Sequence, residues 1–131
     1  MSEIIRVEVA AELSAFSPVR LVLGGLGTRL DFSVEQLEDM YLATEHLFRA
    51  VVRAEELPRF GVEMRLDGGA LWFSAGPFTS RALRKEIEPA TPDGACLDLC
   101  RLLRATCDDV QVRENDGSYQ VILVKSRRSP A

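Results

Sequence analysis

Glu45, Arg49 and Arg53 are the residues of this 131-residue chain whose types and spacing first suggest chemistry. They follow one another at intervals of four, so on a helix they would form a single ridge. A carboxylate in such a place can act as a general base. An arginine beside it would neutralise it, because a guanidinium carries a fixed positive charge and only hydrogen-bond donors. Three roles stay open for Glu45 and Arg49: a surface ion pair, a site with a retained catalytic glutamate, and a contact with a partner.

Two glycines and the single histidine are the next candidates. Gly76 precedes a proline, and we interpret it as part of a strand-ending turn. Gly94 precedes a leucine-rich segment, where it fits a helix start, with anion binding at the helix N-terminus as the alternative. His46 has no serine or cysteine nucleophile that the sequence can assign to it, so we interpret it as a surface residue of a helix.

The three cysteines, Cys96, Cys100 and Cys107, lie on one segment of the chain. With one histidine and no C-x-x-C motif, they do not predict a zinc site, and we expect no metal. We interpret them as small buried side chains in a reducing compartment.

Composition and charge limit the function classes. Hydrophobic residues make up 47% of the chain and charged residues 27%, as in ordinary soluble domains. The net charge of −4 argues against a nucleic-acid partner. The N-terminus has no signal-peptide pattern and no apolar run is long enough for a membrane span, so we expect a cytoplasmic protein with no membrane partner.

The elements that must position these residues follow from apolar periodicity and turn residues. The pattern predicts strands over 4–10, 60–66, 70–75, 109–114 and 118–125, the first of them at a sheet edge. It predicts helices over 17–30 and 34–56, a short helix within 79–88, and a helix near 94–106. We expect one domain over 1–131, with a flexible tail at 126–131. The fold class is α+β: a two-layer sandwich whose mixed, mostly antiparallel sheet is covered on one face by helices.

Three segments of the chain resemble the anti-sigma regulatory factors and serine-protein kinases of bacterial partner switching, which belong to the GHKL (Bergerat-fold) ATPase superfamily. Residues 37–54 look like the first ATP-site helix of that family. The stretch LWFSAGPF at 71–78 looks like the strand that enters the adenine loop. Residues 94–125 are similar to the glycine-rich helix start, the leucine-rich helix and the final hairpin. The resemblance covers about residues 15–125 and implies a Bergerat fold.

The same resemblance implies which residues correspond to the ATP site of the family, on the first ATP-site helix and in the adenine loop. Glu45 matches the acidic position, and it would be catalytic only if the domain is active. Arg49 stands where the family has a magnesium-binding asparagine, and Arg53 stands at its histidine position. In the adenine loop Ser74 replaces an aspartate and Gly76 matches the first glycine.

Two further positions differ from the family pattern in side-chain size. Phe78 replaces the second glycine of the adenine loop. At the phosphate-side loop Gly94 fits, but Cys96 stands at a glycine position. Side chains at such positions keep the backbone away from phosphate, which is the reason for glycine there. The resemblance therefore implies a vestigial nucleotide site made of Arg49, Ser74, Gly76 and Gly94.

Two functions from different classes follow. The favoured one is a pseudoenzyme, a regulatory protein-binding domain that sequesters a sigma factor or an anti-sigma antagonist, as a homodimer, without ATP. The alternative is an active ATP- and magnesium-dependent serine-protein kinase with atypical motifs, in which Glu45 is the base. A generic adaptor on the same scaffold is a third reading, since a fold does not fix a function.

Overall fold

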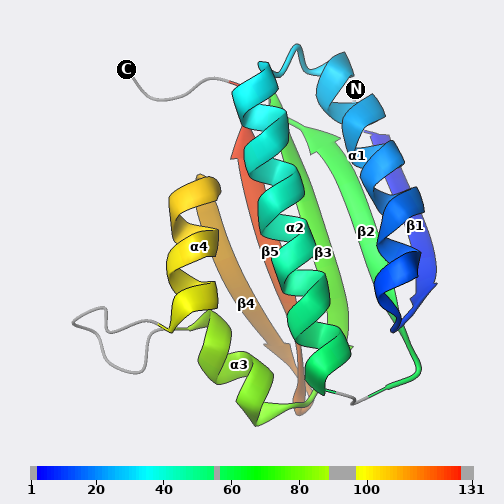
Figure 1. The fold of residues 1–131 in the computed structure, drawn as a ribbon, viewed down its shortest axis with the longest axis vertical. Helices are drawn as coiled ribbons and strands as arrows, with labels where there is room; N and C mark the ends of the chain where they lie inside the picture. The colour runs from blue at the N-terminus through cyan, green and yellow to red at the C-terminus, as the bar shows by residue number, and fades with distance from the viewer. Residues whose placement is uncertain (1–2, 55–56, 89–96, 128–131) are drawn as a thin grey trace.

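A computed structural model describes residues 3–54, 57–88 and 97–127 of the chain (Figure 1). Its strands are β1 (Glu3–Ala10), β2 (Arg59–Asp67), β3 (Ala70–Phe78), β4 (Asp109–Asn115) and β5 (Ser118–Ser126). Its helices are α1 (Phe16–Arg29), α2 (Val34–Ala54), α3 (Arg81–Ile87) and α4 (Asp98–Thr106), and a short 3-10 helix η1 (Leu13–Ala15) precedes α1.

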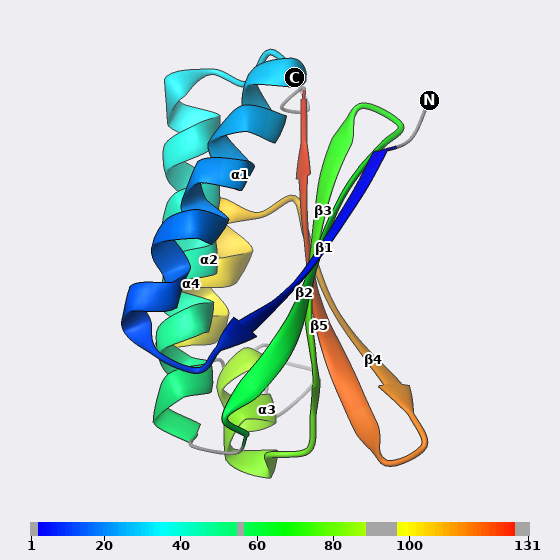
Figure 2. The same cartoon turned by 90° about the vertical axis from the view of Figure 1, so that its right-hand side faces the viewer.

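The five strands form one sheet in the order β1-β2-β3-β5-β4. All four neighbouring pairs are antiparallel, so the sheet is fully antiparallel rather than mixed. Figure 2 shows the helices on one face of the twisted sheet, while none of the described helices covers the other face, which we call the bare face. The α+β two-layer prediction is therefore confirmed, and β1 is an edge strand as expected.

Local signals explain where the helices begin. Ser33 and Gln36 form a capping box before α2: the Gln36 N–H donates to the Ser33 hydroxyl over 3.1 Å, and the Ser33 N–H donates to the Gln36 side chain over 2.9 Å. Ser80 caps α3 by accepting from the Leu83 N–H. The predicted start of α4 at residue 94 lies outside the described residues, and the described helix begins at Asp98.

The core lies between the helices and the sheet. Alternate residues of β2, namely Phe60, Val62, Met64 and Leu66, point into it. An aromatic row continues through Phe16, Phe48, Phe60, Phe78 and Tyr119, with neighbouring ring centroids 5.2–6.0 Å apart. The adjacent strand residues Trp72 and Phe73 point to opposite faces: Phe73 is in the core and Trp72 lies on the bare face. Val34, the first residue of α2, is exposed.

One buried cation joins the layers where β5 ends. The Lys125 ammonium donates to Asp39 of α2 over 3.1 Å and to the Thr106 carbonyl at the end of α4 over 2.8 Å. Within the expected tail, Ser126 still belongs to β5 and the Arg127 N–H donates to the Gly69 carbonyl. Residues 128–131 lie outside the described part.

In the described residues, no helix combines the length and apolar character that crossing a membrane would require.

Candidate functional site

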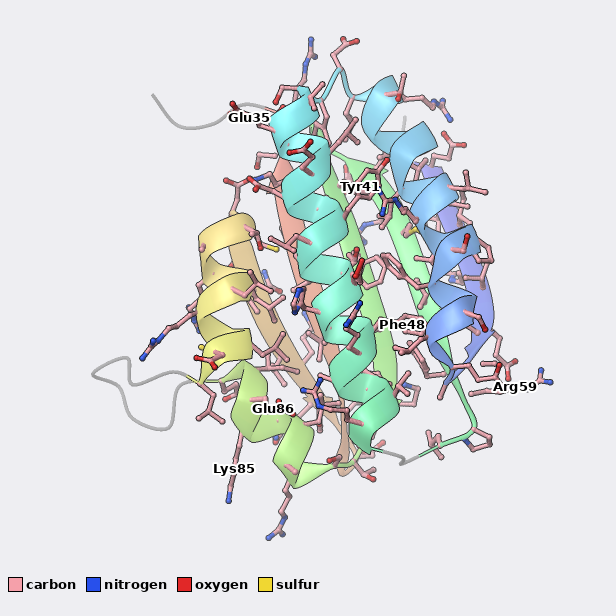
Figure 3. The ribbon with its side chains drawn as sticks, viewed as in Figure 1. Glu35, Tyr41, Phe48, Arg59, Lys85 and Glu86 are labelled. Carbon is pink, nitrogen blue, oxygen red and sulfur yellow. The ribbon has the colours of Figure 1, made fainter. Side chains whose placement is uncertain are left out.

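Glu45 and Arg49 meet on the outer side of α2. The Arg49 Nη2 lies 3.1 Å from Glu45 Oε1, and the two side chains are 54% and 34% exposed, the arginine being the more exposed. They line a groove of about 310 Å³ between α2 and the η1–α1 segment, which Leu13, Phe16, Arg20 and Phe48 also line. Figure 3 shows Tyr41 between α1 and α2. The Arg20 guanidinium lies over the Tyr41 ring, 4.4 Å from its centroid.

Arg53, one turn further along α2, turns toward a different groove. Its Nη2 lies 2.9 Å from Glu86 Oε1 on α3, so an ion pair connects the two helices. The groove beside this pair has a volume of about 670 Å³ and lies between α2, α3 and α4. His46, which is exposed as predicted, lines it together with Leu97, Asp98, Leu99, Arg101 and Leu102.

One salt bridge, from Arg84 to Glu114, joins α3 to the sheet on its other side. The Arg84 guanidinium donates to Glu114 of β4 and, over 2.9 Å, to Glu88. These hydrogen bonds, first the one to Glu114 and then the one to Glu88, raise the pKa of Arg84 above its ordinary value. The Tyr119 hydroxyl also donates to the Ser80 carbonyl at the start of α3. The position of α3, and with it the width of the groove beside Arg53, is therefore fixed by contacts at both sides.

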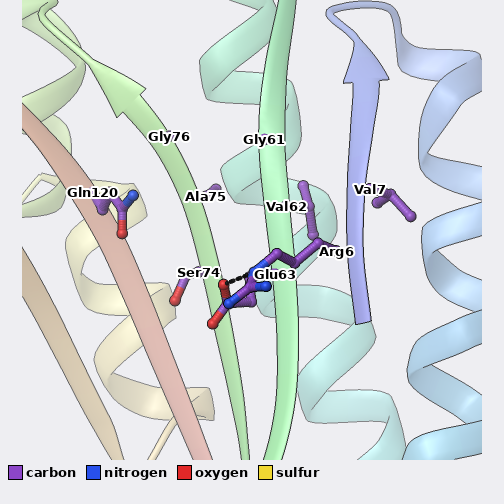
Figure 4. Close-up of a pocket in the computed structure, with 9 residues that line it drawn as sticks. All are labelled: Arg6, Val7, Gly61, Val62, Glu63, Ser74, Ala75, Gly76 and Gln120. Carbon is purple, nitrogen blue, oxygen red and sulfur yellow. Dashed lines mark hydrogen bonds and ion pairs between the residues drawn. The ribbon is translucent and has the colours of Figure 1, made fainter. Parts of the chain in front are cut away.

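Ser74 lies on the bare face of the sheet. It shares a shallow hollow of about 150 Å³ with Gly61, Gln120 and the ion pair between Arg6 and Glu63 (Figure 4). Phe73, the preceding residue, fills the core on the helix side. The sheet and the core thus separate Ser74 from Glu45 and Arg49, and the structure does not bring these three residues together.

Gly76 is required by the packing of the sheet. Its φ is +141°, and a Cβ there would lie 2.9 Å from the backbone carbonyl of Tyr119. Substitution would be strained both by conformation and by space. Phe78, at the family's second glycine position, is 1% exposed and belongs to the aromatic row of the core. The segment that resembles the adenine loop is thus an integral part of the sheet.

The remaining candidates concern the phosphate-side loop and the cysteines. Gly94 and Cys96 lie outside the described residues. Cys100 is buried and disulfide-bonded, which departs from the expectation of reduced thiols, whereas Cys107 is a buried free thiol. The described ranges contain no group of three or more histidine, cysteine, aspartate or glutamate side chains that could hold a metal ion.

Sequence reasoning found the Glu45–Arg49 pair because i, i+4 spacing is a local signal. It missed Glu86 and Glu114, whose partners are distant in the chain. The i, i+4 spacing of Arg84 and Glu88 was a signal that could have been used.

Comparison with known proteins finds similarity in structure and none in sequence. No protein-family model matches the sequence, and no curated protein matches it. The fold is similar to the crystal structure of the RsbU and RsbW domains of Rv1364c from Mycobacterium tuberculosis, with a TM-score of 0.66 and 13% sequence identity. The match covers 95% of this chain and 32% of that one, so this chain spans about a third of the longer protein. At that identity the similarity shows the fold.

Proposed function

We propose that this chain is a regulatory protein-binding domain of the partner-switching type, which sequesters a sigma factor or an anti-sigma antagonist without nucleotide chemistry. The observation that carries the proposal is the ion pair between Arg49 and Glu45 on α2. It neutralises the carboxylate that would be the base and puts a cation at the position that the resemblance gives to the metal ligand.

The side chains on α2 do not fit a magnesium ion. Magnesium needs oxygen ligands in a nearly octahedral arrangement. Arg49 offers only donors, and the oxygens of Glu45 and Glu86 face the guanidinium groups of Arg49 and Arg53. A cation placed among these groups would meet two fixed positive charges. We therefore assign no step to magnesium or to ATP in this chain.

The fold and the shape of the helical layer support a role in binding protein. The similar structure contains an RsbW domain, and this chain shares its fold over most of its own length. Two open grooves run along α2, and exposed leucines lie beside them: Leu13 is 56% exposed and Leu97 is 56% exposed. Exposed apolar side chains next to charged ones are typical of surfaces that bind other proteins.

Titration calorimetry with magnesium and ATP tests the absence of nucleotide chemistry. We expect no saturable heat up to about 1 mM nucleotide, because Arg49 stands at the position of the metal ligand and Ser74 stands at the position of the adenine-binding carboxylate. The same protein should bind a purified sigma factor or antagonist domain in the same assay. Micromolar ATP binding, together with phosphate transfer to a serine of the antagonist, would overturn the proposal in favour of the active kinase.

Glu45→Ala separates the two functions. In an active kinase this variant abolishes phosphate transfer while the fold is retained, since Glu45 is a partly exposed surface residue. In the proposed regulator neither wild type nor variant transfers phosphate, and any effect is limited to partner affinity. Glu38→Ala, an exposed carboxylate on the same helix, is the matched control.

A further inference from the structure

Three hollows adjoin one another across the bare face of the sheet. The hollow of about 150 Å³ beside Ser74 shares Gly76 with a second hollow, of about 480 Å³, and Gln120 with a third, of about 470 Å³. The second and third hollows meet at Pro77. Together they form one depression that crosses the sheet from β1 to β4, which we call the trough.

Two glycines make the floor of the trough. Gly61 of β2 and Gly76 of β3 are partners in the register of the sheet, and Figure 4 shows them on adjacent strands. The next pair toward the middle of the sheet, Glu63 and Ser74, fills its part of the bare face with side chains. The floor of the trough is therefore peptide backbone. Glycine in a strand often marks a place where another chain approaches closely.

The width of this floor fits an extended chain. Side chains on one face of a strand repeat every two residues, or about 7 Å, so one missing row leaves a strip about 14 Å wide between the centres of its neighbours. The side chains of the flanking rows occupy part of that strip. An extended backbone is about 5 Å across and fits the remainder, whereas a helix of about 10–12 Å in diameter does not.

Two arginines of the trough have no carboxylate partner. Within residues 3–54, 57–88 and 97–127, neither Arg59 nor Arg113 forms an ion pair. Arg113 donates to the side-chain oxygen of Gln111 over 3.3 Å, which leaves its charge uncompensated. Both arginines are exposed and line the trough, Arg59 from β2 and Arg113 from β4.

The carboxylates around the trough do not balance these two charges. Glu63 is paired with Arg6, and Glu114 is paired with Arg84. Glu8 belongs to the β1 end, beyond the two arginines. The part of the trough between β2 and β4 is therefore positive, on a chain whose net charge is −4. Its electrostatic complement is a ligand with carboxylates.

The strand spacing sets the distance between those carboxylates. Arg59 and Arg113 stand three strand spacings apart in the sheet order, which is about 14 Å. An extended chain covers this distance in about four residues, and its residues i and i+4 point to the same side. Two arginines neutralise only two phosphates, too few for a nucleic acid to bind firmly at physiological salt.

We propose that the trough binds an extended acidic segment of a partner protein, whose carboxylates at i and i+4 pair with Arg59 and Arg113. This surface lies on the layer opposite to the two grooves along α2. The inference therefore goes beyond the proposed function and holds whether or not that function is correct.

A displayed library of random ten-residue peptides, selected on the wild-type protein, supplies the probe. We expect enrichment of peptides with two carboxylates at i and i+4. Fluorescence anisotropy of one such labelled peptide then measures its affinity. Arg59→Glu and Arg113→Glu should each weaken binding at least about fivefold, because each replaces an attraction by a repulsion. Arg101→Glu, the same change at an exposed site on α4, should bind like wild type.

Two further measurements separate ion pairing from misfolding. A peptide with lysines in place of both carboxylates should prefer the double variant Arg59→Glu/Arg113→Glu to wild type. Ser74→Tyr places a ring beside the floor without changing the charge, and it should weaken the original peptide at least about fivefold. Circular dichroism confirms that each variant is folded.

Several results would overturn the proposal. They are a selection that yields no peptide binding more tightly than about 1 mM, and enriched peptides without the paired carboxylates. An affinity that either arginine variant or Ser74→Tyr leaves unchanged would do so too, as would tighter binding of a single-stranded oligonucleotide at the same arginines. Calorimetry with ATP or with a sigma factor is a separate measurement, so the proposed function does not depend on these outcomes.

Discussion

Arg49 and Arg53 stand at two adjacent turns of α2, and each binds a carboxylate of its own chain on a different side of the helix. Arg49 closes on Glu45 beside α1, and Arg53 reaches across to Glu86 on α3. The two guanidinium groups therefore line two grooves rather than one pocket. The four-residue spacing places Arg49 and Arg53 on the same face of α2. In the structure they turn to different neighbours, because α1 packs beside Arg49 and α3 packs beside Arg53.

Cys107 is the residue for which the structure gives a specific pH dependence. Burial raises the pKa of its thiol to about 11, although the Thr106 hydroxyl and Lys125 act against this rise. At pH 9 the folded protein should therefore hold roughly fifty times less Cys107 thiolate than the unfolded chain, where the pKa is about 8.5–9. We expect iodoacetamide to alkylate Cys107 at least about fifty times faster in denaturant.

The same shift predicts the sign of a stability change. A raised folded-state pKa means that the folded protein retains its proton where the unfolded chain loses it. This contribution is fully present below about pH 8.5 and decreases as the pH rises toward 11. Mass spectrometry of the alkylated peptide follows the rate, and Cys107→Ala should lose the corresponding pH-dependent part of stability. Equal alkylation rates in native and denatured protein would contradict the buried thiol.

At the level of helices and strands, the glycines of α1 differ in their surroundings. A Cβ on Gly27 would lie 2.4 Å from Leu37 Cδ2 and 3.1 Å from Phe32 Cδ2, whereas a Cβ on Gly25 would have no atom within 4 Å. Gly27→Ala should destabilise the protein by about 1–3 kcal/mol through overpacking between α1 and α2. Gly25→Ala, the matched control, should stabilise it by about 0.5–1 kcal/mol through helix propensity. Urea unfolding gives both values, and equal effects would contradict this packing of the two helices.

Most elements could be predicted from the sequence because their signals are local. The Ser33–Gln36 capping box and the hairpin turns before β3 and β5 specify their own boundaries. The sequence alone could not predict whether Ser74 faces the helices or the bare side of the sheet. Strand alternation places Ser74 on the face of Trp72, but which face carries the helices depends on contacts of Phe73 with residues far along the chain. Long-range pairs such as Arg53 with Glu86 have no local signal at all.

For the molecule as a whole, Lys125 connects the sheet to both α2 and α4. Its side chain is 11% exposed, and it contacts a carboxylate and a backbone carbonyl from two different helices. Asp39→Asn would leave a largely buried ammonium without its counter-charge and should destabilise the fold by about 1–3 kcal/mol. Glu38→Gln, an exposed neighbour, should change stability by less than about 0.5 kcal/mol. Denaturant unfolding compares the two, and similar values for both would show that Lys125 does not depend on Asp39.

The bare face has a further consequence, because it contains the only tryptophan of the sequence. Trp72 lies there under the Arg65 guanidinium, whose carbon is 4.9 Å from the ring centroid, next to Ile122 and Val124. The fluorescence of Trp72 therefore depends on the environment of the bare face. A partner that covers this side will shift the emission to shorter wavelength, while a partner on the helices will leave the spectrum unchanged. A single spectroscopic titration can thus assign a bound protein to one of the two layers.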